Sequence, residues 1–283
     1  NDGSQLVSKR KYVEDYTGTG SDTPSLAIAH QKAKNINNLI ENVILRKRTT
    51  DSTVVGGSLT LYEVENNMLV KDRIKSLPAG ASFSASAITG GQFQYASAYE
   101  DEIEFTRYDA KGNVLEGLAK DGIVLSFVWD EDLQLIAQIK GAASTAVYYT
   151  SFEDATANFS TTARTGAKSY LGSYLVTPPG AGAYQLTYWK KQGGADWQLV
   201  ETSISTATTI GDAETLIDEV RVFPAGALMT TYTYKPGIGI SSITDTNNTT
   251  AYYEYDNFHR LLFVRDQNGD ILKNYQYHYR TQE

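Results

Sequence analysis

The chain has 283 residues, no cysteine, and 25 basic against 33 acidic residues, which gives a formal net charge of −8 at pH 7. An acidic chain without a basic cluster is not expected to bind nucleic acid. The missing cysteine excludes disulfides and thiolate metal sites, and no apolar stretch is long enough to span a membrane as a helix. The 20 tyrosines, with many Thr, Val and Ile, are typical of half-buried strands. Composition therefore predicts a mostly β fold.

A helix is the one expected exception to the β pattern, over residues 24–45. Apolar side chains recur there at alternating steps of about four and three residues, as they do on one face of a helix. The residues on this face are Ala29, Ala33, Ile36, Ile40 and Val43. Asp22 or Thr23 is expected to cap the helix, with Pro24 as its first residue. The β-branched pair Val43-Ile44 leaves open an earlier end, with a strand after it.

Strands are predicted after this helix. Apolar and polar residues alternate over Ser58–Val64, Leu69–Leu77 and Glu102–Arg107. Asn66-Asn67 lies between the first two and predicts a turn. Residues 78–92 are rich in Ala, Ser and Gly, which predicts an exposed loop.

The pattern changes between residues 147 and 224. Short strands are separated there by Gly, Pro and Asp at spacings of roughly 10–20 residues, which predicts a small antiparallel sandwich. Alternation along the strand at 184–191 predicts one face that points into the core. The residues on that face are Tyr184, Leu186 and Tyr188.

The C-terminal part repeats a short pattern with a period of about 21 residues. Asp245 and Asp266 open the two copies. Spaced tyrosines close them: Tyr253, Tyr255, Tyr275, Tyr277 and Tyr279. Self-similarity at a fixed period is typical of arrays whose units bury their faces by stacking on one another.

An earlier copy of the same pattern begins at Tyr108-Asp109. It aligns with Tyr255-Asp256, and Gly122 aligns with Gly269 at the same offset. Each unit is therefore predicted to be a strand, a glycine-bearing turn and a returning strand, with Asp-Gly and Asn-Gly as two-residue turns. His259 stands where the earlier copy has a glycine, so a negative φ and a locally altered turn are expected there.

The repeated residues resemble the YD-repeat (Rhs-type) family, of the Bacteroidetes kind, in which Tyr-Asp, Arg-Leu and Asp-x-Asn-Gly follow one another. Residues 147–224 resemble jelly-roll carbohydrate-binding modules. That second resemblance is carried by Phe152-Glu153, the Gly-x-Lys-Ser segment at 166–169, the strand that contains Trp189, and the closing strand Ile217–Val220. Together the resemblances imply antiparallel hairpins in a curved sheet, with an inserted jelly-roll-like β-sandwich and one helix in the N-terminal region.

Three domains follow from this resemblance: 1–146, an N-terminal β region with the helix and the first YD-like unit; 147–224, the sandwich; and 225–283, the YD-repeat hairpins. The implied function is a non-enzymatic structural or interaction segment of a large secreted or surface Rhs-type protein. Its implied partners are other parts of a longer YD-repeat chain, and its implied location is extracellular or at the bacterial cell surface. The start at Asn1, without a signal sequence, predicts a piece of a longer protein. The alternative function is a carbohydrate-binding module that recognises polysaccharide.

A structural calcium is the one cofactor to consider. In many jelly-roll relatives, acidic residues on the opening and closing strands hold this ion, so Glu153 and Asp218 are candidate ligands, helped by Asp154 or Asp212. Calcium takes about six to eight oxygen ligands at loosely fixed geometry, which carboxylates and carbonyls supply together. The alternative is that Glu153 and Asp218 are edge residues with ordinary hydrogen bonds.

Trp189, Trp197 and nearby Tyr188 are the candidate glycan-binding residues. A flat exposed ring can stack on the apolar face of a sugar. The alternative is that Trp189 is covered where the inserted module rests on the array. Exposure of Trp189 and Trp197 side by side would favour the first interpretation, and burial against the array would favour the second.

Catalytic motifs are missing from the sequence. It contains no Gly-x-Ser-x-Gly elbow, no His-Glu-x-x-His and no phosphate-binding loop. The acidic clusters Glu100–Glu102 and Asp130–Asp132 are expected to be solvated turns, not a glycosidase pair. The chain is therefore predicted not to be an enzyme.

Overall fold

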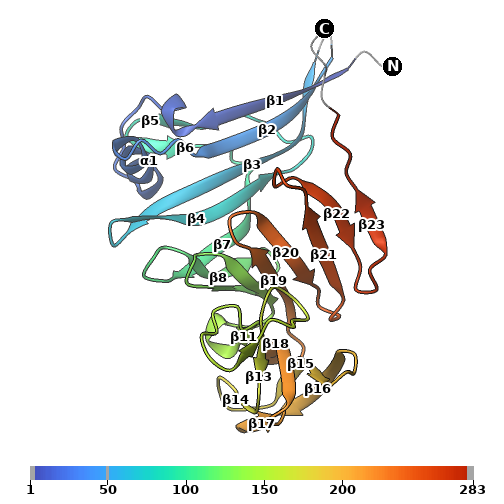
Figure 1. The fold of residues 1–283 in the computed structure, drawn as a ribbon. Helices are drawn as coiled ribbons and strands as arrows, with labels where there is room; N and C mark the ends of the chain where they lie inside the picture. Colours follow the sequence, from blue (N-terminus) through green and yellow to red (C-terminus); the bar gives the residue numbers. More distant parts are fainter. Residues whose placement is uncertain (1–3, 49–50, 279–283) are drawn as a thin grey trace. The chain divides into compact units, whose positions relative to one another are not determined.

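The computed structural model describes residues 4–48 and 51–278 (Figure 1). Strands account for 52% of the residues and helix for 6%, which confirms the mostly β prediction. The chain divides into two compact units, Asn1–Val124 and Leu125–Glu283. Among the described residues, no helix has the length and apolar character needed to cross a bilayer. Tyr279 of the predicted tyrosine series lies outside the described residues, and the boundaries of the three predicted domains stay a prediction.

The first unit contains an antiparallel sheet. Its strands follow the order β1 (Gln5–Tyr12), β2 (Leu39–Lys47), β3 (Ser52–Glu65), β4 (Met68–Leu77), β7 (Glu100–Tyr108) and β8 (Val114–Ala119). The strands predicted from alternation lie within β3, β4 and β7, which confirms them. Asn66 and Asn67 have φ angles of 49° and 65° between β3 and β4. Two successive positive φ angles are typical of a two-residue hairpin turn, and asparagine tolerates them.

The helix α1 (Thr23–Ala33) is shorter than predicted. Ile40 and Val43, which the periodicity assigned to it, are buried in β2. Asn35 follows the helix with a φ of 56°, which breaks the helical conformation. The spacing of apolar residues continued across this break, but the β-branched residues after it favour a strand.

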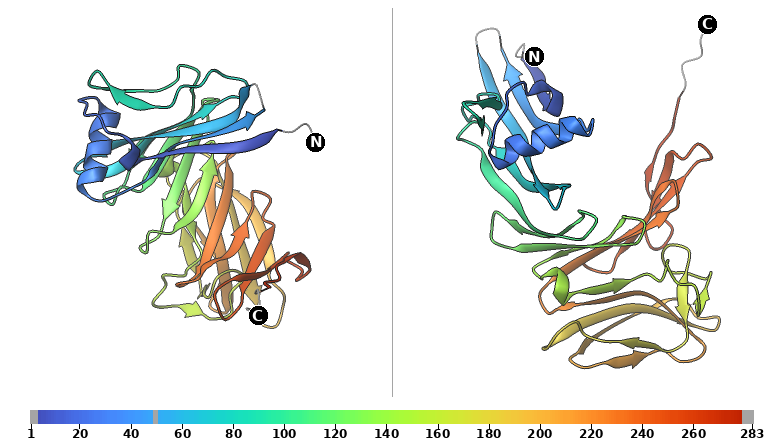
Figure 2. Two further views of the ribbon diagram at one scale, coloured as in Figure 1. Left: turned by 90° about the horizontal axis from the view of Figure 1, so that it is seen from above. Right: turned by 90° about the vertical axis from the view of Figure 1, so that its left-hand side faces the viewer.

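The helix also buries a different face from the predicted one. Ala29 and Ala33 are exposed. The buried residues are Ser25, Ala27, Ile28 and Gln31. Pro24 is the second residue of the helix instead of the first. Asp22 is the N-cap residue, but its carboxylate accepts the Phe93 backbone N–H at 2.9 Å and no helix N–H. Helix α1 contacts β3 and lies against the strands of this unit in Figure 2.

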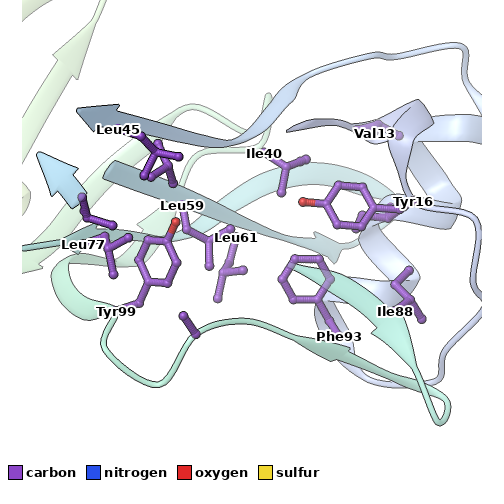
Figure 3. Close-up of a cluster of buried hydrophobic side chains, with 14 residues drawn as sticks. Val13, Tyr16, Ile40, Leu45, Leu59, Leu61, Leu77, Ile88, Phe93 and Tyr99 are labelled. Carbon is purple, nitrogen blue, oxygen red and sulfur yellow. The ribbon is translucent and has the colours of Figure 1, made fainter. Parts of the chain in front are cut away.

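The predicted exposed loop at 78–92 is wrong in part. It contains β5 (Ala87–Thr89), which pairs with β6 (Gln92–Gln94), and it buries Ser86 and Ile88. Ile88 belongs to the main core of the unit (Figure 3). The Ser86 backbone N–H donates to the buried Glu41 at 3.0 Å, and the Tyr99 hydroxyl donates to the same carboxylate at 2.9 Å. Small residues allow this segment to follow the core closely, and Glu41 holds it there.

The second unit contains a further antiparallel array. Its strands are β9 (Val124–Trp129), β10 (Leu135–Lys140), β19 (Leu228–Lys235), β20 (Gly239–Thr244), β21 (Thr250–Tyr255), β22 (Leu261–Arg265) and β23 (Ile271–Asn274). Strand β10 pairs directly with β19, with Ala137 opposite Thr231 and Ile139 opposite Met229. The residues between these two strands therefore leave the array and return to it at the same place, as an insertion does.

One turn geometry recurs in both units. In each copy, an aspartate backbone N–H donates to the carbonyl four residues later, and the N–H three residues after the aspartate donates back to its carbonyl. The aspartates are Asp109, Asp130, Asp245, Asp256 and Asp266. Their side chains accept a backbone N–H within the same turn, which fixes its shape. The turns at Asp245, Asp256 and Asp266 lie about ten residues apart, and Ala119 makes the same pair of backbone bonds between the turns at Asp109 and Asp130. Each predicted YD unit therefore consists of two hairpins.

These turns correct the predicted geometry in two ways. The hydrogen bonds are those of a three-residue loop whose last residue is left-handed, and not of the predicted two-residue turn. His259 has a φ of 61°, although a negative φ was expected, and its N–H makes the same bond to Asp256 that Gly112 makes to Asp109. The turn at His259 is therefore unaltered. The same position is left-handed at Leu133, with a φ of 64°.

The inserted sandwich has two sheets with a shared core. The larger contains β11 (Tyr148–Thr150), β12 (Phe159–Ser160), β13 (Ser169–Leu171), β18 (Thr215–Pro224), β15 (Tyr184–Gln192) and β16 (Gln198–Ile204), and the smaller contains β14 (Tyr174–Val176) and β17 (Thr208–Ile210). Side chains of both sheets meet in one buried cluster. Tyr184, Leu186 and Tyr188 are 6%, 0% and 8% exposed in this cluster, which confirms the predicted core face.

Candidate functional site at the sandwich–array joint

A bulge in β18 brings three charged residues to one face of the strand. Trp189 of β15 lies opposite Asp218, but Thr187 lies opposite Arg221, so β18 contains one extra residue. Glu219 takes up the extra residue with a φ of 53°. If side chains alternated regularly along β18, Glu219 and Arg221 would point into the sandwich core, as Ile217 does. With the bulge, both lie on the outer face beside Asp218, while Val220 stays in the core.

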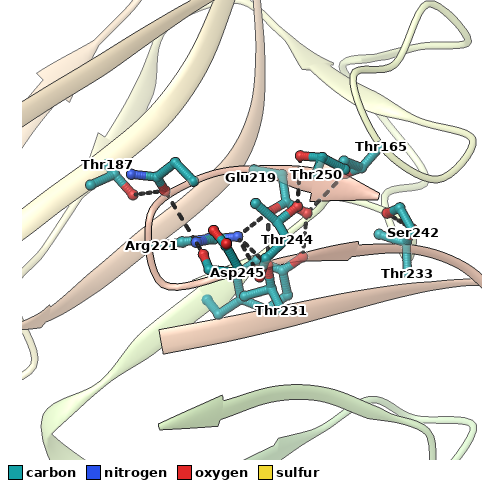
Figure 4. Close-up of polar contacts among 12 residues, drawn as sticks. Thr165, Thr187, Glu219, Arg221, Thr231, Thr233, Ser242, Thr244, Asp245 and Thr250 are labelled. Carbon is teal, nitrogen blue, oxygen red and sulfur yellow. Dashed lines mark hydrogen bonds and ion pairs between the residues drawn. The ribbon is translucent and has the colours of Figure 1, made fainter. Parts of the chain in front are cut away.

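The Glu219 carboxylate is the centre of a buried polar network (Figure 4). The Tyr149 hydroxyl and the Thr165 hydroxyl donate to its Oε1 at 2.8 Å and 2.9 Å. The Thr231 hydroxyl and Nη2 of Arg221 donate to its Oε2 at 2.8 Å and 2.9 Å. Thr231 belongs to β19 of the array, so this carboxylate joins the sandwich to the array.

Arg221 extends the same network to the next array turn. Its Nη1 donates to the Asp245 carbonyl and to Oδ1 of Asn248, both at 3.1 Å, and its Nη2 donates to the Thr244 carbonyl at 3.4 Å. Asn248 in turn donates to Glu201 of β16 at 2.8 Å. The Thr187 hydroxyl of β15 also donates to Oδ1 of Asn248, at 3.5 Å. The repeated aspartate turn that begins at Asp245 is therefore bound to the sandwich from three strands.

The two adjacent carboxylates have opposite pKa shifts. Burial raises the pKa of Asp218 well above its usual range, and the charge of Glu219 adds to this shift. Burial also acts to raise the pKa of Glu219, but Arg221 and the hydroxyls of Tyr149, Thr231 and Thr165 outweigh burial and lower that pKa. Glu219 is thus the ionised partner of Arg221. A buried Arg–Glu pair with its remaining donors and acceptors largely satisfied holds a unique arrangement, although it adds little net stability over apolar residues.

Asp218 and Glu153 hold one loop of the sandwich. Oδ2 of Asp218 accepts the backbone N–H groups of Arg164 at 2.7 Å and Thr165 at 3.0 Å. The Glu153 carboxylate accepts those of Ala167 at 3.0 Å and Lys168 at 3.1 Å. Burial raises the pKa of Glu153. The two carboxylates therefore bind neighbouring parts of the same loop.

This arrangement bears on the predicted calcium ligands. Glu153 and Asp218 direct their oxygens to separate sets of amide donors, which suits carboxylates and does not suit a cation between them. Within residues 4–48 and 51–278, no group of three or more His, Asp or Glu side chains is placed to hold a metal ion. The pair does not fit a calcium ion in this arrangement, and calcium binding stays a prediction without a ligand set.

The predicted glycan-binding residues differ in burial. Tyr188 is buried in the sandwich core, so its ring has no surface to offer a sugar. Trp189 is half-buried, and the Arg164 guanidinium lies over its ring at 4.4 Å. Tyr252 of the array donates its hydroxyl to the Arg164 carbonyl at 2.9 Å. Trp189 therefore contacts a sandwich residue that is itself bonded to the array, and the choice between its two interpretations stays open. Trp197 is half-buried in the segment before β16.

Sequence reasoning missed Glu219, Arg221 and Thr231. A signal was present, because the strand Thr215–Pro224 places Asp218, Glu219 and Arg221 among apolar residues without regular alternation. Charged residues are almost never fully buried unless they are paired. Adjacent charges of both signs in an apolar strand predict a buried pair, but their partners on β19 and β20 could not be found without the pairing of β10 with β19.

Comparisons with known proteins give limited information. No family model matches the chain, and no curated protein matches it. The solved structure described as TcdB2-TccC3-Cdc42 is similar with a TM-score of 0.27 and 11% identity, over 97% of this chain and 10% of that chain. The structure described as TcdB2-TccC3-TEV has a TM-score of 0.18 and 12% identity, over 92% of this chain and 10% of that chain. This chain spans about a tenth of the length of those chains. TM-scores at this level do not define a shared fold.

Proposed function

We propose that the chain is a non-enzymatic structural segment of a YD-repeat (Rhs-type) protein, in which an array of β-hairpins carries a firmly attached sandwich. The direct pairing of β10 with β19 across the inserted residues is the observation that carries this proposal. A module on a flexible linker needs no such pairing, whereas here both ends of the insertion are held in one antiparallel ladder.

The buried network supports the same function. It binds the sandwich to β19 through Thr231 and to the β20–β21 turn through Asp245 and Asn248. The recurring aspartate turns support the comparison with a repeat array, because the same local solution is used each time the chain reverses. Secretion or display at a bacterial surface belongs to this proposal and rests on the resemblance of the repeats.

Limited proteolysis of the whole chain tests the attachment. The segments that join sandwich and array, 141–147 and 225–227, should be cleaved slowly in the native protein, and Arg221→Met should accelerate cleavage there. Release of an intact sandwich from the unmutated chain at low protease concentration would contradict the proposal. The matched control is Glu254→Gln, which removes the acid of a more exposed ion pair with Arg265 in the same unit and should leave the cleavage pattern unchanged.

Polysaccharide binding is the competing function. A panel of polysaccharides offered to the chain and to a Trp189→Ala variant separates the two functions. Reproducible binding of one polysaccharide to the chain, lost in a variant of unchanged stability, would indicate carbohydrate recognition as the function. The structural proposal predicts that no polysaccharide binds in this way. It also predicts that the Trp189→Ala variant is less stable, because Trp189 stacks on Arg164 at the joint.

A further inference from the structure

A groove of about 320 Å³ lies in the second unit, between the array and two loops of the sandwich. Its walls are mainly apolar and include Ile136 of β10, Tyr232 and Tyr234 of β19, and Phe152 of the sandwich. The Tyr234 hydroxyl donates to the Leu135 carbonyl at 2.7 Å, which fixes one of the rings. The groove is at the lower end of the volumes of small-molecule sites, roughly 300–1,000 Å³, so it suits one large side chain better than an oligosaccharide.

Carboxylates from two elements of the fold line this groove. Asp130 and Asp132 come from the turn between β9 and β10, and Asp154 comes from the sandwich loop that follows β11. Burial raises the pKa of Asp130, and the charges of Asp154 and Asp132 add to this shift. The carboxylates of the two elements are therefore close enough to repel one another.

A cation of the chain itself does not neutralise these carboxylates. Lys168 is the one basic residue among those that line the groove, and its Nζ donates to the carbonyls of Glu153 and Ala155 at 2.8 Å and 2.9 Å. In the part of the chain that the structure describes, no ion pair joins a lysine or arginine to Asp130, Asp132 or Asp154. Apolar walls together with these carboxylates complement a side chain with an apolar stem and a cationic end.

We infer that this groove binds an arginine side chain in an extended segment of a partner polypeptide. A guanidinium is planar, stacks on aromatic rings and forms paired bonds with carboxylates, while its aliphatic stem covers apolar surface. The chain already uses this combination elsewhere, because Arg260 lies over Tyr277 at 4.3 Å and bonds to Asp256 at 2.8 Å. The formal net charge of −8 would favour the approach of a basic partner.

A titration of the isotopically labelled whole chain, followed by NMR, tests this inference. The probe is an acetylated, amidated pentapeptide with a central arginine flanked by Ser and Gly. The arginine peptide should shift the amide signals of Gln134, Tyr232 to Tyr234 and Asp154, and its affinity should fall with added salt. The same peptide with citrulline, a neutral isostere of arginine, should bind at least about tenfold more weakly, since hydrogen bonds to charged groups are the strong ones.

Variants of the groove complete the test. Asp132→Asn combined with Asp154→Asn removes two exposed charges, and it should weaken binding about three- to tenfold without unfolding the chain. Asp196→Asn is the matched control, because Asp196 is also exposed, in the same unit, and does not line the groove. Equal binding of the citrulline and arginine peptides would overturn the inference. So would peptide shifts confined to other residues, or the same shifts produced by calcium chloride alone.

This inference goes beyond the proposed structural function and does not depend on it. An array whose role is to carry the sandwich does not require this groove. Binding of arginine in the groove does not require the chain to be part of a longer array. Failure of the titration would leave the proteolysis result unaffected, and failure of the proteolysis test would leave the titration unaffected.

Discussion

Replacing Glu219 with glutamine tests the buried network in the most informative way. The substitution keeps the shape of the side chain but removes the charge that faces Arg221, whose Nη2 lies 2.9 Å from Oε2. Both side chains are at most 2% exposed, so solvent cannot replace the lost partner. Removing one member of a buried ion pair costs about 3–5 kcal/mol, because the remaining charge is left uncompensated.

The surroundings of Arg221 predict that the loss of stability in Glu219→Gln lies near the lower end of this range. Its guanidinium keeps the carbonyl oxygens of Thr244 and Asp245 and Oδ1 of Asn248 as acceptors. The substituted glutamine side chain would still accept the hydroxyls of Tyr149 and Thr165 through its amide oxygen. We therefore expect Glu219→Gln to lower the free energy of unfolding by about 3 kcal/mol.

Tryptophan fluorescence during urea unfolding measures this cost selectively. The three tryptophans, Trp129, Trp189 and Trp197, all lie in the unit Leu125–Glu283, so their emission follows that unit alone. With a urea dependence of about 1–3 kcal/mol per molar, the midpoint should fall by about 1–3 M. Arg221→Met combined with Glu219→Gln should cost less than the sum of the single substitutions, because no buried charge remains.

The control is Glu254→Gln, whose carboxylate is 49% exposed and pairs with Arg265 at 2.8 Å. Exposed pairs contribute about 0–1 kcal/mol, so its midpoint should stay close to that of the unmutated chain. A Glu219→Gln midpoint indistinguishable from that of Glu254→Gln would refute the reasoning, since it would show that the network carries no particular weight.

Three other predictions concern the turn, the acid range and calcium. His259→Gly should raise the free energy of unfolding by about 1 kcal/mol, because a left-handed residue with a Cβ is strained, and a urea midpoint that falls would contradict this. Because the pKa of Glu219 is lowered in the folded chain, its ionisation stabilises the fold at pH values above its unfolded pKa of about 4.3. This stabilisation is lost as pH falls through the folded pKa. The difference in stability between the chain and Glu219→Gln should therefore narrow at low pH, and a constant difference down to about pH 2 would count against the ionised pair. The raised pKa of Asp218 has the opposite effect: the protonated side chain stabilises the fold at low pH, and this stabilisation is lost as pH rises from about 3.9 through the folded pKa. The predicted calcium site requires a melting temperature that is higher in calcium than in chelator and that Asp218→Asn renders insensitive to calcium. Equal melting temperatures in calcium and chelator would remove that site.

The sequence contained enough to predict the β class, the strands β3, β4 and β7, and the core face of β15. The β class follows from the many Tyr, Thr, Val and Ile residues. The strands and the core face depend on a local period of two, which the backbone itself imposes. The helix was misplaced because an apolar spacing that suits a helix continued by coincidence into β2. The turn at His259 differs from the prediction because a left-handed histidine is uncommon, while the Asp256 side chain accepts a backbone N–H within the turn and fixes its shape.

The joint could not be predicted in the same way. Glu219 faces the array only because a bulge in β18 reverses the alternation, and its partner Thr231 is near only because β10 pairs with β19. Both facts are properties of strand register, which depends on residues far apart in the sequence. Whether Trp189 is covered by the array or stacks on a sugar stays a prediction; in the structure the Arg164 guanidinium lies over its ring.

Hydrogen exchange followed by mass spectrometry tests most directly whether sandwich and array form one firmly joined body. In the unmutated chain, peptides from β18, β19 and β20 should exchange slowly and at similar rates, because one network holds all three strands. Arg221→Met should accelerate all three together, which is the result that the account predicts. Unchanged protection of β19 and β20 in a variant whose β18 exchanges faster would contradict it, because the sandwich would then open without the array.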